Sequence, residues 1–356
     1  MEVLAPKLLS GLRRRGYEFT VVTRNDLVDQ PTEMDCEGTA VHCYPFGKAY
    51  MRGNLEQLLQ MRRHIAQLKR RFAPKLVHIN LFGPSALFHY DTASVDRAPV
   101  LVTIHNKESA MLQHSCATDG LFRKALRSAQ WVTCVSTAVL NHWRQMAPEI
   151  SSYSSVIYNG YAAADLVPTP LPLEPPRLLC LGRLSREKGF DLALTAFASI
   201  VGRFPEARLV IAGDGPERGA LEKQAARLNL ARAVEWLGWI APQNVAQLLT
   251  TVTMILLPSR YEGLPSASVE AALMGRPVVA ARVGGIPEIV VHEQTGLLVP
   301  PEQPNALAQA IELLLDHPQN AIALGAAARQ RAQELFSFER YLTGYEALYT
   351  DLIHSK

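Results

Sequence analysis

The sequence predicts an α/β protein that contains two doubly wound domains, each built on a parallel sheet. Two observations carry this prediction. Short apolar runs alternate with helical patterns along the chain, which is the order that parallel strands with crossover helices require. The alternation stops at 167–176, where five prolines exclude a helix or a central strand, and it then starts again. We therefore expect one Rossmann-like domain over residues 1–168 and a second over 177–337.

The first domain is expected to begin with a helix rather than with a strand. Residues 1–15 carry leucines at helical spacing, and Gly16 ends the pattern. The other elements expected in this half are strand 18–23, helix 54–72, strand 76–80, strand 99–104, helix 121–129, strand 131–135, helix 136–145 and strand 155–158. Their order is typical of a domain with crossover helices.

The second half repeats this order more regularly. The expected elements are strand 177–181, helix 190–203, strand 208–212, helix 217–228, strand 234–237, helix 242–250, strand 254–257, helix 266–274, strand 277–280, strand 296–299 and helices from 305 onward. The tail, 338–356, is amphipathic and carries a stripe of aromatic residues at helical spacing. The stripe predicts a last helix that buries one face.

Composition narrows the class of protein. A chain of 356 residues with 48% hydrophobic content can bury two cores, and a net charge of +3 does not point to nucleic acid as a partner. The five cysteines are scattered and form no C-x-x-C pair, which favours a reducing compartment. No apolar run approaches the ~20 residues that span a bilayer, and no signal peptide opens the chain. We expect a cytoplasmic protein.

Basic residues gather in the first half of the chain. Arg13, Arg14 and Arg15 are consecutive, and more cations follow one helical pattern, namely Arg62, Arg63, Lys69, Arg70, Arg71 and Lys75. One interpretation is an ordinary solvated surface. The other is peripheral contact with an anionic membrane, at its inner face, or with an anionic acceptor.

The most informative stretch is 259–277, S-R-Y-E-G-L-P-S-A-S-V-E-A-A-L-M-G-R-P. It follows the apolar strand 254–257, at the end of a parallel strand, where α/β proteins bind ligands. Glu262 lies in the loop before the expected helix and Glu270 lies within it. A helix start attracts phosphate, and carboxylates beside it accept hydrogen bonds from sugar hydroxyls. A nucleotide-sugar carries both kinds of group.

A second loop, G-R-L-S-R-E-K-G at 182–189, also joins a strand to a helix. Arg183 offers a planar fork and Lys188 a mobile point charge, a combination that suits a diphosphate. His105 ends the apolar strand 99–104 and is a candidate for contact with substrate. The sequence contains no D-x-D motif and no Cys/His cluster with zinc spacing, so we expect no metal.

The extended pattern of 259–277 resembles the retaining glycosyltransferases related to glycogen synthase, family 4 of the GT-B fold. The resemblance implies two domains facing across a cleft, with a UDP- or GDP-sugar on the second domain and a carbohydrate or lipid-linked acceptor on the first. The last helix, 338–356, would pack on the first domain. The reaction implied is glycosyl transfer to an acceptor hydroxyl with retained configuration, in the synthesis of a polysaccharide, glycolipid or other glycoconjugate, without a cofactor.

The same resemblance assigns roles residue by residue. Arg183 and Lys188 would hold the leaving diphosphate, and Glu262 and His105 would position the transferred sugar. Glu270 would accept hydrogen bonds from the ribose. The backbone of three further residues would cradle the donor, namely Gly263, Leu264 and Pro265. Asn106 follows the histidine where the family often has Asp or Gly.

Two alternatives stay open. The order of elements in the family begins with a strand and a glycine loop that residues 1–15 do not contain, so a non-catalytic protein that binds nucleotide-sugars is possible. An epimerase that acts on sugar nucleotides has a similar fold, although the pair Glu262 and Glu270 argues against it.

Overall fold

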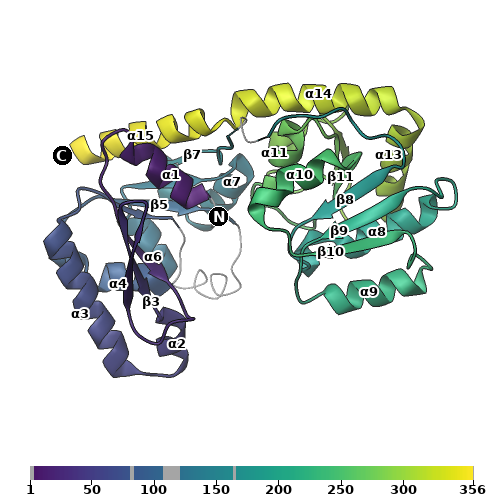
Figure 1. Ribbon diagram of the computed structural model, residues 1–356. Coiled ribbons are helices and arrows are strands. Elements are labelled where there is room, and N and C mark those ends of the chain that lie inside the picture. Colours follow the sequence, from purple (N-terminus) through teal and green to yellow (C-terminus); the bar gives the residue numbers. More distant parts are fainter. Residues whose placement is uncertain (1–3, 81–83, 107–120, 163–165, 356) are drawn as a thin grey trace. The chain divides into compact units, whose positions relative to one another are not determined.

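A computed structural model describes the chain except residues 1–3, 81–83, 107–120, 163–165 and 356 (Figure 1). It divides into two compact units. The first consists of residues 1–135, 139–157 and 342–356, and the second of residues 136–138 and 158–341. The α/β class expected from the alternation of strands and helices is confirmed. Cys116 and the first three residues of the expected helix 1–15 lie outside the described residues.

The first unit contains two sheets. One has the order β1-β3-β2, and the other is fully parallel with the order β4-β5-β6-β7. The strands are β1 Thr20–Arg24, β2 Thr32–Cys36, β3 Thr39–Tyr44, β4 Val77–Ile79, β5 Val100–Ile104, β6 Trp131–Cys134 and β7 Ser154–Val156. The main helices are α1 Leu4–Arg13, α2 Phe46–Met51, α3 Leu55–Phe72, α4 Pro84–Asp91, α6 Leu121–Ser128 and most of α7 Thr137–Met146.

The strands β2 and β3 and the helices α2 and α4 were not expected from the sequence. β2 pairs antiparallel with β3, so the first sheet is mixed. Its sequence T-E-M-D-C is exposed at every position, and it therefore carries no apolar pattern that would predict a strand. β1 and β4 are each an end strand of their own sheet within the described residues.

The end of the chain completes the core of the first unit. Helix α15, Phe338–His354, contributes Tyr345 and Tyr349, both almost fully buried. The Tyr349 hydroxyl lies 2.6 Å from Nδ1 of His78 on β4, and the Tyr345 hydroxyl lies 3.0 Å from Oγ1 of Thr103 on β5. Burial lowers the pKa of His78 to about 3, so its imidazole stays neutral inside this network. His78 is thus held between β5 and α15 by hydrogen bonds at both ring nitrogens.

The second unit contains one parallel sheet of six strands with the order β10-β9-β8-β11-β12-β13. The strands are β8 Arg177–Leu181, β9 Arg208–Ala212, β10 Val234–Gly238, β11 Met254–Leu257, β12 Val278–Ala281 and β13 Leu297–Val299. The helices are α8 Phe190–Ile200, α9 Arg218–Arg227, α10 Val245–Thr250, α11 Ser266–Leu273, α12 Ile286–Ile289, α13 Pro304–Asp316 and α14 Pro318–Leu335. Buried side chains of β8, β9 and β11 pack with those of α8, α9 and α13 to form its core.

The proline-rich segment 167–176 is tied to the second unit by a buried arginine. Arg276 has no exposed surface, and its guanidinium donates to the carbonyl oxygens of Leu249 at 2.7 Å, Thr169 at 3.1 Å and Pro170 at 3.3 Å. It also donates to Oγ1 of Thr169 at 2.5 Å. Burial lowers the pKa of Arg276. These oxygens replace the hydrogen bonds to water that the guanidinium loses when it is buried.

Two further features of the described residues concern membranes and metal ions. None of the helices in this part of the chain has the length and apolar character that crossing a bilayer requires. The described His, Cys, Asp and Glu side chains form no group of three or more that could hold a metal ion.

Candidate functional site

Four loops of the second unit meet where strands β8, β9, β11 and β12 end. The loops after β8 and β9 are joined by hydrogen bonds from Leu184 N to Asp214 O at 2.9 Å and from Glu217 N to Leu184 O at 3.0 Å. The loop after β11 is joined to the first of these by Arg260 N, which donates to Glu187 O at 2.8 Å. The carboxyl ends of parallel strands thus gather backbone from distant parts of the sequence, as they do at the ligand sites of α/β proteins.

Glycines at positions 213 and 284 allow the loops after β9 and β12 to approach the backbone of neighbouring loops closely. A Cβ atom at position 213 would lie 1.8 Å from the carbonyl oxygen of Gly182, and one at position 284 would lie 1.8 Å from that of Glu262. Gly284 also has a φ of +52°, a conformation that residues other than glycine rarely adopt. The loop that carries Glu262 is therefore held in place by the glycine turn after β12.

Lys188 and Glu262 form an ion pair at the centre of these loops. The Lys188 Nζ atom lies 2.8 Å from Oε1 and 3.0 Å from Oε2 of Glu262. Lys188 belongs to the loop after β8, where the turn Arg186–Lys188 precedes α8, and Glu262 belongs to the loop after β11. The Glu262 side chain is 7% exposed and the Lys188 side chain 25%, so the acid is buried while the lysine side chain is partly exposed.

Ser259 completes this cluster. Its hydroxyl donates to Oε1 of Glu262 at 2.8 Å, and the serine is almost fully buried. Glu262 is thus fixed from two sides, by a cation and by a neutral donor. A ligand that draws Lys188 away would still find the carboxylate oriented by Ser259.

Arg260 fastens the same loop to α8, a role that we did not expect from the sequence. Its guanidinium donates to both carboxylate oxygens of Asp191 at 2.8 Å, to Glu302 at 3.0 Å and to the carbonyl oxygen of Arg186 at 2.9 Å. Hydrogen bonding to Asp191 raises the pKa of Arg260. The two-pronged contact fits the planar fork of arginine and would not survive replacement by lysine. The signal in the sequence was only that Arg260 lies within the stretch 259–277.

Helix α11 begins directly after this loop, at Ser266, and ends at Leu273. Its N-cap is Pro265. The three residues directly before the helix, Gly263, Leu264 and Pro265, are all buried. Glu270 lies one turn into α11 and is only partly buried among buried neighbours. Its charge acts on Tyr161, a buried residue whose pKa is raised chiefly by burial and also by Glu270. Tyr161 is a neighbour of Glu270 that the sequence did not suggest.

Two of the candidates are not in the ion-paired cluster. Arg183 lies in the same loop as Lys188, but its side chain is exposed and makes no ion pair with the described residues. His105 directly follows β5 in the first unit, where its Nε2 atom lies 3.2 Å from Oδ1 of Asn80. Burial lowers the pKa of His105 to about 4, so this imidazole is neutral at physiological pH. A neutral imidazole both donates and accepts hydrogen bonds, as contact with sugar hydroxyls requires.

The two halves of the chain match two glycosyltransferase families. The model described as Glycosyltransferase Family 4 matches residues 1–164, and the model described as Glycosyl transferases group 1 matches residues 164–331. Sucrose-phosphate synthase from Thermosynechococcus elongatus superimposes with a TM-score of 0.83 over 98% of this chain and 92% of that one, at 24% identity. Each half of the chain therefore carries a glycosyltransferase domain, and the fold is GT-B.

Curated relatives also match most of the chain. Glycogen synthase from Mycobacterium tuberculosis is 29% identical over 374 residues, covering 96% of this chain and 88% of that protein. N-acetyl-alpha-D-glucosaminyl L-malate synthase from Bacillus anthracis is 28% identical and covers 83% of this chain and 79% of its own length.

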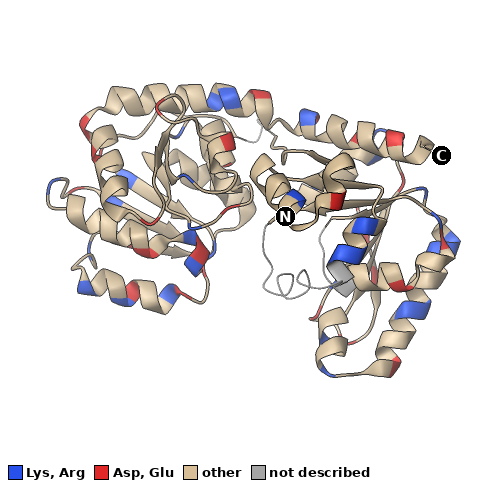
Figure 2. Ribbon diagram, turned by 180° about the vertical axis from the view of Figure 1, so that it is seen from behind, with Lys and Arg blue, Asp and Glu red and all other residues tan. Residues whose placement is uncertain are grey.

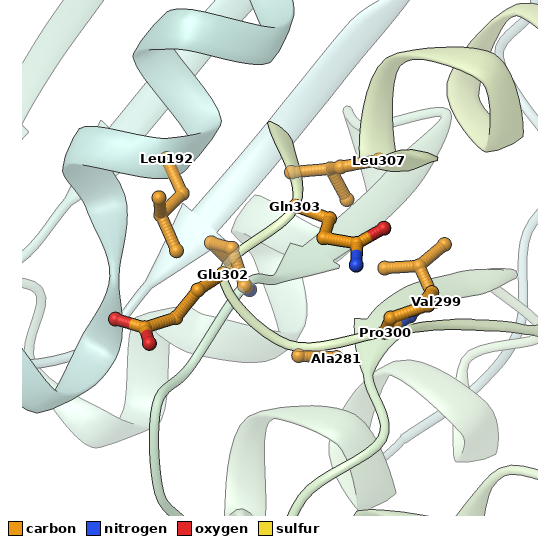
Figure 3. A pocket seen from close by; sticks show the side chains of 8 residues that line it. Leu192, Ala281, Val299, Pro300, Glu302, Gln303 and Leu307 are labelled. Atoms are coloured by element: carbon orange, nitrogen blue, oxygen red, sulfur yellow. The ribbon is translucent and has the colours of Figure 1, made fainter. Parts of the chain in front are cut away.

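A small hollow in the second GT-B unit lies beside the cluster. Figure 3 shows its lining side chains around the ends of β12 and β13 and the start of α8. The lining consists of Leu192, Pro258, Ala281, Val299, Pro300, Glu302, Gln303 and Leu307. The Glu302 carboxylate points away from Gln303 and is the one that Arg260 binds (Figure 3). None of these residues is a predicted site residue, and we assign the hollow to packing beside the site.

The turn at Gly284 provides a test of how rigidly the site is held. Gly284→Ala is expected to lower the melting temperature by about 5 °C, because the new methyl group would collide with the Glu262 carbonyl and the backbone would be strained. Thermal unfolding followed by circular dichroism measures this change. Gly219→Ala on α9 is the matched control, since a Cβ atom there meets nothing within 4 Å. Equal melting temperatures for both variants would contradict the close approach.

Proposed function

We propose that this protein transfers a glycosyl group from a nucleotide-diphosphate sugar to an acceptor hydroxyl, with retained anomeric configuration. The observation that carries the proposal is the pairing of Lys188 with Glu262 beside the start of α11. A cation, a buried carboxylate and a helix N-terminus in one place match the three parts of a sugar diphosphate, which are phosphate charge, sugar hydroxyls and a leaving group that becomes more negative.

The chemistry follows from these groups. The bond between the anomeric carbon and the diphosphate oxygen breaks, and its electron pair leaves with the diphosphate. Lys188 and Arg183 stabilise the charge that grows on the departing oxygens, because the loop places both cations at the same strand end. The acceptor hydroxyl attacks the anomeric carbon from the same face, and its proton passes to the leaving phosphate. We propose that Lys188 and Arg183 take the role that a metal ion plays toward the diphosphate in other transferases.

The carboxylates act on the sugar parts of the donor. When Lys188 turns toward phosphate, the Glu262 carboxylate is released to accept a hydrogen bond from the transferred sugar while Ser259 keeps it oriented. Glu270 accepts hydrogen bonds from the ribose. His105, neutral at physiological pH, contacts the transferred sugar from the first unit.

The donor and acceptor classes are also proposals. We propose a UDP- or GDP-sugar donor, without a further cofactor, and a carbohydrate or lipid-linked acceptor. UDP is the first nucleotide to test, because an Anabaena protein with the same fold, HepE, has been solved with UDP-glucose. We further propose that the protein works at the cytoplasmic side of a membrane and contacts it peripherally.

Binding and transfer are tested in two steps. Thermal shift with uridine, guanosine and adenosine diphosphates should show stabilisation by one of the first two, of about 2.7 kcal/mol at a hundredfold excess over Kd. Release of that nucleotide from a panel of its sugars, with the anomeric configuration of the product read by NMR, tests transfer. Stabilisation without nucleotide release or product would favour the non-catalytic alternative. No stabilisation by any of the three nucleotides would contradict the donor site.

A further inference from the structure

Five large apolar side chains are exposed around one turn of the first unit. Tyr50 and Met51 end α2 and are 65% and 87% exposed, and Leu55 and Leu59 begin α3 and are 67% and 43% exposed. Leu27, in the loop after β1, is 93% exposed. We call these five residues the apolar tip. Single exposed apolar residues are common, but several on adjoining segments indicate a surface that contacts another body.

The apolar tip is held in one shape by polar contacts beneath it. The Asp26 carboxylate accepts from the backbone N–H groups of Gly47 at 2.9 Å and Lys48 at 3.2 Å. Lys48 Nζ lies 2.8 Å from Asp29, and the Gln57 amide donates to the Asp29 carbonyl at 2.7 Å. The loop after β1 is therefore fixed to both α2 and the start of α3. The exposure of the five side chains is part of the folded structure.

Cations continue this surface along α3. The helix carries one acid, Glu56, and five Lys or Arg side chains. Lys69 is not available, because it is buried against Asp96 at 2.9 Å, which corrects its assignment to a basic surface. Arg62 lies 3.9 Å from Asp91. The exposed arginines of α3 that make no ion pair with the described residues are Arg63, Arg70 and Arg71.

Two of these arginines, Arg63 and Arg70, share one side of the helix with the apolar residues Leu55 and Leu59. Leu55, Leu59 and Arg63 are spaced four residues apart, and Arg70 follows Arg63 after seven, so the side chains line one face. Figure 2 marks the Lys and Arg positions of the chain, those of this helix among them, in blue. The face is apolar where α3 begins and cationic further along.

We propose that this face docks the protein on an anionic lipid bilayer. An anionic bilayer can bind both parts of this face at once. Its acyl chains can accommodate the apolar tip, and its anionic headgroups can pair with Arg63 and Arg70. Nucleic acid would match the cations but would leave the exposed leucines and methionine in water. The proposal rests on the peripheral membrane contact proposed above and names the surface that makes it. It requires neither a donor nor an acceptor, so its test can fail while the proposed transfer reaction stands.

The full-length protein is tested by co-sedimentation with vesicles of phosphatidylcholine containing 30% phosphatidylglycerol, and with vesicles of phosphatidylcholine alone. We expect binding to the anionic vesicles that weakens as salt rises. Arg63→Gln combined with Arg70→Gln should lower the partition coefficient about 30-fold, from about 1 kcal/mol for each cation. Met51→Ser combined with Leu55→Ser should lower it about tenfold or more, because less apolar surface enters the bilayer.

Matched variants in the second unit control for general effects. Leu313→Ser on α13 removes another exposed leucine, and Arg227→Gln on α9 removes another exposed arginine; both should bind vesicles as the parent does. Unchanged melting temperatures show that the tested variants are folded. The proposal is overturned if the parent protein fails to bind anionic vesicles at low salt, or if either double variant binds as well as the parent. Equal binding to neutral vesicles overturns the role of the arginines.

Discussion

Lys188→Ala is expected to lower kcat by about 10²–10³-fold, the magnitude that follows loss of one preorganised group facing the charge of a transition state. The reason is its position. Lys188 is the partly exposed cation that pairs with the buried carboxylate of Glu262, so it is placed to exchange that carboxylate for a diphosphate. Glu262→Ala should reduce turnover to a similar degree, since the sugar loses an acceptor that Ser259 orients. Nucleotide release under saturating donor measures both effects.

The Lys188 variant also needs a control for stability. Removing the ammonium leaves a carboxylate that is 7% exposed without its cation, which by itself destabilises the unit. The double variant Lys188→Met with Glu262→Gln removes both charges and should recover the melting temperature but not the turnover. Lys223→Ala, on the exposed side of α9, should keep both. Near-normal turnover in the folded Lys188 or Glu262 variant would refute the proposed mechanism.

Arg276→Ala is expected to cause the largest loss of stability, about 3 kcal/mol or more. The guanidinium is fully buried, and its loss would leave the carbonyl oxygens of Leu249, Thr169 and Pro170 without their donor and would open a cavity as well. For a unit of this size the melting temperature should fall by about 10 °C. Differential scanning calorimetry measures the change.

An exposed arginine provides the comparison for Arg276. Arg203 contacts Asp316 at 2.8 Å with a side chain that is 57% exposed, so Arg203→Ala should change stability by less than about 1 kcal/mol. Limited proteolysis adds a second reading, because the segment around Thr169 and Pro170 should be cut faster once Arg276 is gone. Each kcal/mol of lost stability should lower the melting temperature by about 2–4 °C. If Arg276→Ala melts within about 2 °C of the parent protein, the buried contacts of Arg276 contribute little to stability.

The second unit could be predicted from the sequence almost element by element. The strands β9, β11, β12 and β13 are buried almost throughout, so they read as continuous apolar runs, and glycines and prolines help to mark where strands end. The stretch 259–277 predicted a loop followed by a helix, and α11 confirms this. The contact between Lys188 and Glu262 could not be derived in detail, because it joins residues 74 positions apart through the packing of two loops.

The first unit was harder to predict, for physical reasons. β2 is exposed at every position and α2 is only six residues long, so neither carries the periodicity that burial imposes. The helical pattern of 54–72 was read correctly, but the pattern could not show that Lys69 is buried on Asp96 while Arg63 is free. Arg260 was missed as a structural residue because its partners, Asp191 and Glu302, are distant in sequence.

The participation of α15 in the first unit has a consequence for biosynthesis. Domains of a growing chain generally fold as they emerge, the earlier ones first. Here the hydroxyl groups that meet His78 and Thr103 belong to Tyr349 and Tyr345, which are translated after the whole of the second unit. The half of the protein that the ribosome makes first therefore reaches its final core last.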